Sequence, residues 1–200
     1  MTRTPLLDPK SRYVGATSLD DFTAADWAIL ATQRPAYQAE LQANQALRLL
    51  SASKDDPSFG YHVNNYRHCV QAATRALADG RDDAYIVAAL LHDIGFIACP
   101  TSHAEFAAKL LAPYVDEKIA WIVERHAIFQ AHHYNEHPAA DRTARERWRG
   151  HPHFEAAAEF VARYDQCTVD ANAPEAELAV FEPMLRRVFA RPPRILPPPP

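Results

Sequence analysis

Histidines and acidic residues in the middle of the chain are the side chains whose types and spacing could do chemistry. The chain has 10 histidines in 200 residues, and neutral imidazole is the commonest metal ligand in proteins. His92 is followed directly by Asp93 at the end of the apolar run 88–91. Burying such a pair without a partner costs several kcal/mol, which a divalent cation would offset. The dipeptide alone is weak evidence, because buried His and Asp side chains are commonly satisfied by hydrogen bonds.

Other positions also put a histidine or an acid on the inward face of a predicted helix. His68 lies in line with small residues, and His126 and Asp165 each lie in line with apolar ones, at spacings of three or four. His103 follows Ser102, which is a candidate N-cap. Each residue alone could be a satisfied core group. Together they favour a buried metal site made of His68, His92, Asp93, His103, His126 and Asp165.

The elements that must position these residues are predicted to be helices. The chain has only 5 glycines, its 16 prolines lie mostly at segment ends, and no segment shows the alternation of a strand. Capping residues and apolar periodicity predict helices over about residues 24–32, 36–50, 66–77, 83–95, 103–110, 117–126, 154–166 and 178–189. No repeat or linker divides them, so a single all-α domain is expected over 1–200. Residues 191–200 end in four prolines and are expected to form an extended tail.

Composition narrows the class of partner. The net charge of −4, from 21 basic and 25 acidic residues, gives no basic surface for nucleic acid or for an anionic membrane. The sequence shows no signal peptide and no apolar run of the roughly 18 residues that a membrane helix needs. Cys69, Cys99 and Cys167 form no C-x-x-C pair, which fits a reducing compartment. We therefore expect a cytoplasmic protein with a small-molecule partner, while the oligomeric state stays open.

The order of the six candidate ligands resembles the HD-domain superfamily of metalloproteins, whose core is a five-helix bundle. The compact length, the two histidines after the His-Asp pair and the last aspartate are similar to the mixed-valent diiron oxygenases, which include myo-inositol oxygenase and the organophosphonate oxygenases. The segment from His68 to His126 resembles the organophosphonate branch. The similarity spans about residues 61–170, and it implies an HD-domain helical bundle with additional N- and C-terminal helices.

The resemblance also implies a ligand set and a reaction. One iron would be held by His68, His92 and Asp165, the other by His103 and His126, and Asp93 would bridge them as the catalytic residue. Imidazole and carboxylate leave iron open to dioxygen, whereas thiolates favour zinc or clusters. The implied cofactors are two iron ions, Fe(II)/Fe(III), with O2 as cosubstrate. The implied reaction is oxidative cleavage of a C–P or C–C bond in a small, anionic, hydroxylated substrate such as a 1-hydroxyalkylphosphonate.

Substrate-binding residues are less sharply indicated. Phe96 stands one helical turn after the His-Asp pair, where many members of the family carry a basic residue or a histidine. Arginines in the loop 141–149 could bind an anion instead, or could simply form a solvated basic loop. Neutral donors just beyond His126 could line the pocket, and two residues before the first ligand helix could form a lid. The predicted set is Tyr61, His62, Gln130, His133, Arg142 and Arg145, with His132 as a further neutral donor.

Two other functions remain open. A metal-dependent HD phosphohydrolase would use the same centre to polarise a phosphate ester or nucleotide and to lower the pKa of a water nucleophile. The two histidines after the pair argue for a binuclear site, which disfavours mononuclear nucleotidases but not binuclear phosphodiesterases. A non-catalytic helical binding module is the third possibility, although a structural metal site is normally closed and rich in cysteine.

Overall fold

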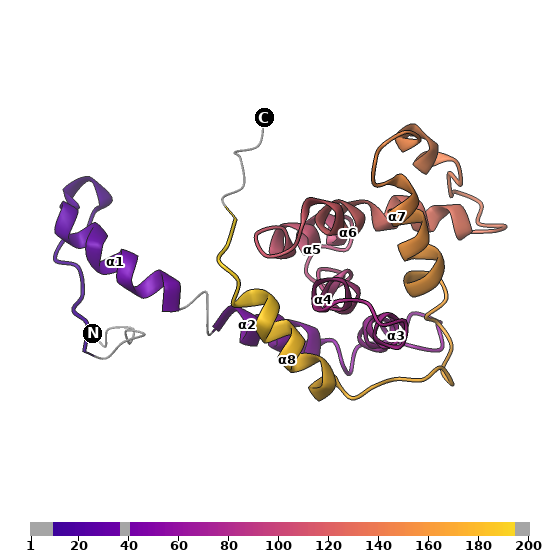
Figure 1. The fold of residues 1–200 in the computed structure, drawn as a ribbon, viewed down its shortest axis with the longest axis horizontal. Coiled ribbons are helices and arrows are strands. Elements are labelled where there is room, and N and C mark those ends of the chain that lie inside the picture. The colour runs from indigo at the N-terminus through magenta and orange to yellow at the C-terminus, as the bar shows by residue number, and fades with distance from the viewer. Residues whose placement is uncertain (1–9, 37–40, 195–200) are drawn as a thin grey trace.

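Helices make up all the regular secondary structure of the described residues, 10–36 and 41–194, in the computed structural model (Figure 1). The all-α prediction is therefore confirmed. The α-helices are α1 (Ala24–Ala36), α2 (Gln42–Ala52), α3 (Asn65–Ala78), α4 (Asp83–Leu91), α5 (His103–Leu111), α6 (Glu117–Gln130), α7 (Phe154–Phe160) and α8 (Leu178–Phe189). Of the helix predicted over 36–50, residues 37–40 lie outside the described residues.

α4 is the central helix of the bundle. In Figure 1 the other helices of the body surround it, and α3, α6 and α8 pack directly against it. Every residue from Ala84 to Leu91 is buried, as expected of a helix that is apolar on all its faces. Asp82 caps its N-terminus by accepting a hydrogen bond of 2.9 Å from the Tyr85 N–H.

α4 ends four residues earlier than the sequence predicted. The helix stops at Leu91, and the chain continues in turns through Gly95. This turn passes very close to α5, since a Cβ added at Gly95 would lie 2.9 Å from the Phe106 Cβ. His92 keeps right-handed helical backbone angles (φ −57°, ψ −33°), and the side chains of His92 and Asp93 are both buried.

A π-helical turn interrupts the helix predicted over 154–166. α7 ends at Phe160, and Val161–Asp165 form the turn, in which the Gln166 N–H bonds to the Val161 carbonyl at 3.0 Å. This bond spans five residues instead of four, so the turn is wider than an α-helical one. Asp165 is fully buried at its end. The prediction of one uninterrupted α-helix is therefore wrong at its C-terminal end, whereas the predicted inward orientation of Asp165 is confirmed.

The first and last described helices differ in where they lie. α2 packs on α8, whereas α1 lies apart from the body (Figure 1). Of the expected proline-rich tail 191–200, the first residues bond to the loop between α5 and α6: Arg191 donates to the Tyr114 carbonyl at 3.2 Å and the Arg194 N–H to the Pro113 carbonyl at 2.8 Å. Residues 195–200 lie outside the described residues.

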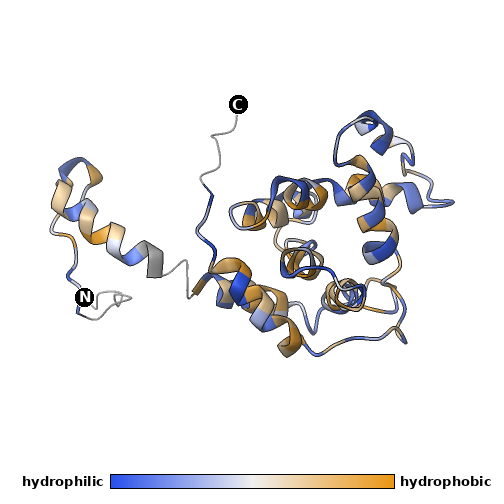
Figure 2. Ribbon diagram, viewed as in Figure 1, coloured by the Kyte–Doolittle hydropathy of each residue, from blue (hydrophilic) through white to orange (hydrophobic). Residues whose placement is uncertain are grey.

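Apolar residues concentrate in the interior. Figure 2 shows α4 in hydrophobic colours and the loops that follow α6 in hydrophilic ones. Across the described part of the chain, every helix is either too short or too polar to cross a bilayer.

Candidate metal centre

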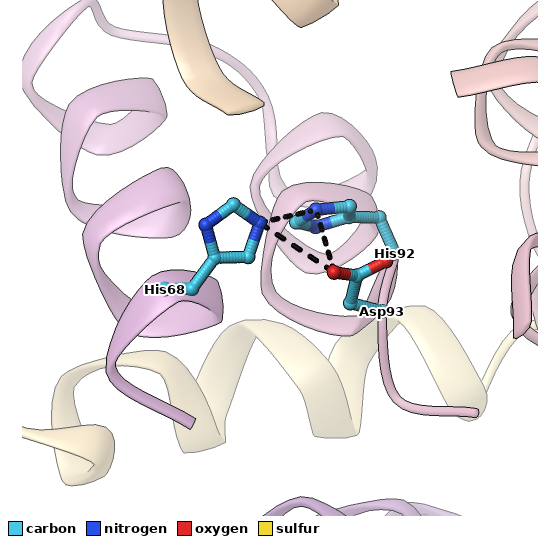
Figure 3. Close-up of side chains that lie close together, drawn as sticks. All are labelled: His68, His92 and Asp93. Atoms are coloured by element: carbon cyan, nitrogen blue, oxygen red, sulfur yellow. Dashed lines mark hydrogen bonds and ion pairs between the residues drawn. The ribbon is translucent and has the colours of Figure 1, made fainter. Parts of the chain in front are cut away.

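Four histidines and two aspartates meet beside the end of α4. His92 and Asp93 come from the turn after this helix (Figure 3). The others come from α3, α5, α6 and the π turn. All except the half-buried His103 are buried. The structure therefore brings together all six side chains that the sequence singled out: His68, His92, Asp93, His103, His126 and Asp165.

Asp93 lies between two pairs of imidazoles. Its Oδ1 is 3.0 Å from the Nε2 of His126 and 3.2 Å from the Nε2 of His103. Its Oδ2 is 3.6 Å from the Nε2 of His68 and 3.8 Å from the Nε2 of His92. Each carboxylate oxygen thus faces a different pair of histidines, which is the arrangement that a bridging ligand requires.

Asp165 completes only one of the two pairs. Its Oδ1 lies 3.4 Å from the Nε2 of His68 and 3.8 Å from that of His92. The side-chain amide of Gln130 donates to this same oxygen at 2.6 Å. The Asp165 Oδ2 is buried and has no hydrogen-bond partner. A buried carboxylate oxygen without a partner is costly, so this atom is suited to a cation.

Hydrogen bonds fix the tautomer of all four histidines. Each Nδ1 faces a backbone carbonyl, which can only accept, so each Nδ1 carries the proton and each neutral ring turns a bare Nε2 toward the centre. The acceptors for His68, His92, His103 and His126 are the carbonyls of Thr168 (3.2 Å), Ala89 (2.8 Å), Pro100 (2.9 Å) and Val123 (2.7 Å).

The bare nitrogens fit a metal better than they fit one another. The Nε2 atoms of His68 and His92 are 3.0 Å apart (Figure 3). Two neutral rings would point their lone pairs at each other across this gap, which is repulsive unless a proton or a cation lies there. The converging donors are nitrogen and oxygen only, a set that suits iron. Cys69 is buried nearby but belongs to none of the groups whose ligand atoms lie within 4.8 Å of one another.

The two carboxylates make the centre attractive to positive charge. Burial lowers the pKa of His68 and of His103, but hydrogen bonds to Asp165 and Asp93 outweigh it and raise each pKa to about 9. Burial likewise opposes ionisation of Asp93 and Asp165, but the surrounding histidines hold the pKa of both carboxyls below the usual range. Protons therefore bind where a cation would, and the two compete.

A cavity of about 310 Å³ opens onto the centre. His68 and Asp93 form part of its wall, next to Asn65, Phe96 and Tyr134. Three of the predicted substrate-binding residues also line it, namely Tyr61, Gln130 and His133. This cavity is where a substrate could reach the candidate metal ligands.

The other predicted substrate-binding residues lie elsewhere. His62 is exposed and is not part of the cavity wall. Arg142 donates to the His132 carbonyl at 2.9 Å, and Arg145 pairs with Glu146 at 3.4 Å. These arginines bond within the excursion between α6 and α7 (residues 131–153), and neither is part of the cavity wall.

The sequence analysis missed two residues that position the candidate metal ligands, Tyr134 and Thr168. Tyr134 donates through its hydroxyl to the Gln130 Oε1 at 2.5 Å, which fixes the amide that holds Asp165. The buried Thr168 hydroxyl lies 2.9 Å from the His68 Nδ1 and donates to the Asp165 carbonyl at 2.5 Å. Tyr134 follows Gln130 by four residues and Thr168 follows Asp165 by three, so helical spacing from a predicted site residue could have found both.

No protein-family model matches the chain, and no curated protein matches it. The fold and the site define it as an all-α protein with a buried cluster of histidines and aspartates that could hold a metal ion.

Proposed function

We propose that the chain is an HD-domain protein that uses two iron ions and dioxygen to cleave a C–C or C–P bond of a small hydroxylated substrate. The observation that carries the proposal is the position of Asp93, with one carboxylate oxygen facing each of two histidine pairs. A centre for one ion has no need of this symmetry. The three unpaired cysteines support a cytoplasmic location for the enzyme.

Each ion would have its own ligands. His68, His92 and Asp165 would hold one, His103 and His126 the other, and Asp93 would contact both. When bound, the iron pair would supply the redox chemistry and the Lewis acidity needed to oxidise the substrate with dioxygen. Six protein ligands for two ions leave coordination positions for small molecules.

The remaining task of the protein is to position groups and to exclude water. Asn65 donates to the Asp93 backbone carbonyl at 3.0 Å, so it holds the turn that carries the bridging carboxylate. Gln130 orients Asp165, and Tyr134 orients Gln130. Val63 and Phe96 give the cavity an apolar wall beside the centre. Fixed groups of this kind lower the barrier by holding the reactants in one geometry.

The cavity wall favours the oxygenase over a phosphohydrolase. Among the described residues that line it, none is lysine or arginine. A phosphate monoester carries about two negative charges at neutral pH, and enzymes that bind it commonly add arginine or lysine contacts to those of the metal. A hydroxyl or carbonyl oxygen has no such need, whereas a phosphonate shares it, so within the oxygenase proposal the wall favours C–C over C–P cleavage.

Metal analysis and oxygen uptake test the proposal together. Protein grown with added iron and purified without chelator is expected to hold about two irons per chain. After partial reduction, low-temperature EPR should show the half-integer-spin signal of an Fe(II)/Fe(III) pair. The iron-loaded protein is then offered 1-hydroxyalkylphosphonates, inositols, 1,2-diols and phosphate monoesters while oxygen uptake and phosphate release are followed.

The outcomes separate the two enzyme classes. Oxygen uptake that depends on a hydroxylated substrate supports the proposal. The matched control is Asp93→Asn, whose side chain has nearly the same volume, and this variant should show no such uptake. Phosphate release from monoesters without oxygen, together with no substrate-dependent oxygen uptake in the panel, would identify a phosphohydrolase instead. A protein that keeps zinc and takes up no iron would point the same way.

A further inference from the structure

The cavity wall away from the metal centre is uncharged. His68 and Asp93 bring the centre to one part of the wall, whereas much of the rest is apolar and aromatic. Among the other described residues of the lining, His133 alone is acidic or basic. Burial is the main cause that lowers the pKa of the His133 ring below its usual value, and the nearby His132 lowers it further. The apolar lining residues are Pro57, Phe59, Tyr61, Val63, Phe96 and Val169.

The amide side chains of the wall already have hydrogen-bond partners in the protein. The Gln130 amide donates to Asp165 and accepts from Tyr134. Gln166 donates to the Ala162 carbonyl at 3.1 Å, and Asn65 donates to the Asp93 carbonyl. These groups are committed to holding the site together, so they are poorly placed to solvate a charge on a ligand.

Exposed aromatic rings stand at the mouth of the cavity. Phe59 is 77% exposed and Tyr61 is 64% exposed, although both line the cavity. Phe59 has a φ of 54°, which is strained for a bulky side chain. Asn64 holds this loop through bonds from its side-chain amide to the carbonyls of Lys54 (2.8 Å) and Asp56 (3.0 Å). Strain that persists at a pocket is typical of segments that contact a ligand.

We propose that this cavity selects a substrate with an oxygen-bearing head and an uncharged, largely hydrocarbon tail. The head lies at the metal centre, so this inference rests on the proposed function. The tail lies against Val63, Phe96 and Val169, and Phe59 and Tyr61 cover it at the mouth. The cavity volume of about 310 Å³ is at the small end for ligand pockets, so the tail is short.

A charge at the end of the tail would be buried without a partner. Such burial is costly whichever sign the charge has. Arg142 and Arg145 are excluded as partners for an anionic tail, because they lie outside the lining and bond within the excursion. The cavity wall therefore discriminates between substrates by the charge of their tails, whereas the metal centre would bind the oxygen-bearing heads equally well.

Binding of three matched hydroxamates to zinc-loaded protein tests the inference without any turnover. All three share a head that chelates metal through two oxygens. 6-Methylheptanohydroxamate has an uncharged tail, the monohydroxamate of adipic acid has a carboxylate of similar shape in place of the terminal isopropyl group, and 6-aminohexanohydroxamate has an ammonium group at the end of a chain of the same length. By titration calorimetry, the uncharged compound is expected to bind at least about tenfold more tightly than either charged one. Equal or tighter binding of a charged compound, or no binding of any of them, would overturn the inference.

A charge introduced into the wall sharpens the test. Phe96→Lys places an ammonium group in the cavity, and Phe96 is only half-buried, so the new side chain can be accommodated. This variant is expected to bind the adipic compound more tightly than the uncharged one, whereas the control Phe96→Leu keeps the wild-type order. If Phe96→Lys fails to fold, the comparison of the three compounds on wild-type protein still decides.

The two proposals can fail separately. Preferential binding of the uncharged hydroxamate, with no oxygen uptake from any hydroxylated substrate, would remove the oxygenase and leave the selectivity of the cavity standing. Oxygen uptake only from substrates with charged tails would do the reverse.

Discussion

The chain uses its histidines in two different ways. Four of them point Nε2 at two buried aspartates, and each has its Nδ1 fixed by a backbone carbonyl. Five others lie in the excursion, where they stack and bond locally. His151, for example, stacks on Trp121 with ring centroids 4.2 Å apart and planes only 5° apart, and His132 bonds to the Arg142 carbonyl. The number of histidines alone therefore does not indicate a metal site; convergence on buried carboxylates is what distinguishes the candidate metal centre from the excursion.

The largest expected effect comes from removing the residue that joins the two histidine pairs. Asp93→Ala should lose both metals, because this carboxylate faces both pairs. Asp165→Ala should weaken mainly the binding of the ion proposed at His68 and His92, which are the nearest imidazoles to its carboxylate. Metal content per chain by mass spectrometry measures both. Full metal occupancy in Asp165→Ala would remove Asp165 from the ligand set.

A histidine of the excursion supplies the matched control for these variants. His132→Ala removes an imidazole that bonds only to a loop carbonyl, so metal content should equal that of the wild type. Loss of metal in His132→Ala would erase the distinction between the two groups of histidines.

A smaller effect is expected from crowding the turn that carries the His-Asp pair. In Gly95→Ala the new Cβ would meet the Phe106 Cβ at 2.9 Å and the His103 carbonyl at 3.0 Å. The start of α5 would have to shift to relieve this clash, which would destabilise the protein by about 1–3 kcal/mol. The shift would also move His103, so the affinity for the ion proposed at His103 and His126 should fall. Denaturant unfolding and metal titration measure the two effects.

Gly80→Ala is the control for this crowding. Gly80 has a φ of +69° and nothing within 4 Å of an added Cβ, so the substitution strains the backbone by about 1 kcal/mol without a clash. The unfolding midpoint should fall while metal affinity stays unchanged. Equal loss of metal affinity in both variants would contradict a specific role for the Gly95 turn.

A substitution in the excursion should change the stability of the protein but not its metal content. His151→Ala removes the ring stacked on Trp121, a contact worth about 1 kcal/mol. We expect a slightly lower unfolding midpoint, unchanged metal content and faster proteolysis between residues 131 and 153. A change in metal content would show that the excursion helps to build the centre.

The smallest effect is expected at the opposite end of α4. Arg187 donates to Asp83 at 2.7 Å, and this hydrogen bond lowers the pKa of the Asp83 carboxyl below its ordinary value of 3.8. A lowered folded-state pKa contributes stability that is present above pH 3.8 and is lost as the pH falls through the folded value. Because the pair lies at the surface, where solvent screens it, Arg187→Met should lower the free energy of unfolding only slightly at pH 7.

The pH dependence identifies the source of that small effect. Chemical unfolding of wild type and of Arg187→Met is compared from pH 7 down to the acid limit of the fold. The difference should shrink as the pH falls below 3.8. A difference that stays constant with pH would assign it to lost packing of the arginine side chain.

Much of the bundle, and the residues that meet at the candidate site, could be predicted from sequence because both depend on local rules. Asp82 and Asp116 cap their helices by accepting from a backbone N–H three residues later, a short-range pattern that marks helix starts. Spacings of three and four residues placed His68, His126 and Asp165 on inward faces. Such rules need no knowledge of the partner helices.

What the sequence missed depends on tertiary packing. The end of α4 at Leu91 and the π turn before Asp165 follow from the way the helices meet, which no local pattern encodes. The path of the excursion depends on contacts such as that of His151 with Trp121, so the arginine-rich composition could not show that Arg142 and Arg145 turn away from the cavity. The excursion has no periodicity from which its direction could be predicted.

The carbonyls that fix the four imidazoles differ in how far along the chain they lie from the ring they hold. His92, His103 and His126 each bond to the carbonyl three residues earlier, within their own short stretch of backbone. His68 bonds to Thr168, which is 100 residues away. Three imidazoles are thus oriented as soon as their local segment has its native shape, whereas the fourth waits for the segment after Asp165 to dock. Transient release of that segment would free His68 first and leave the other three rings aimed at the centre.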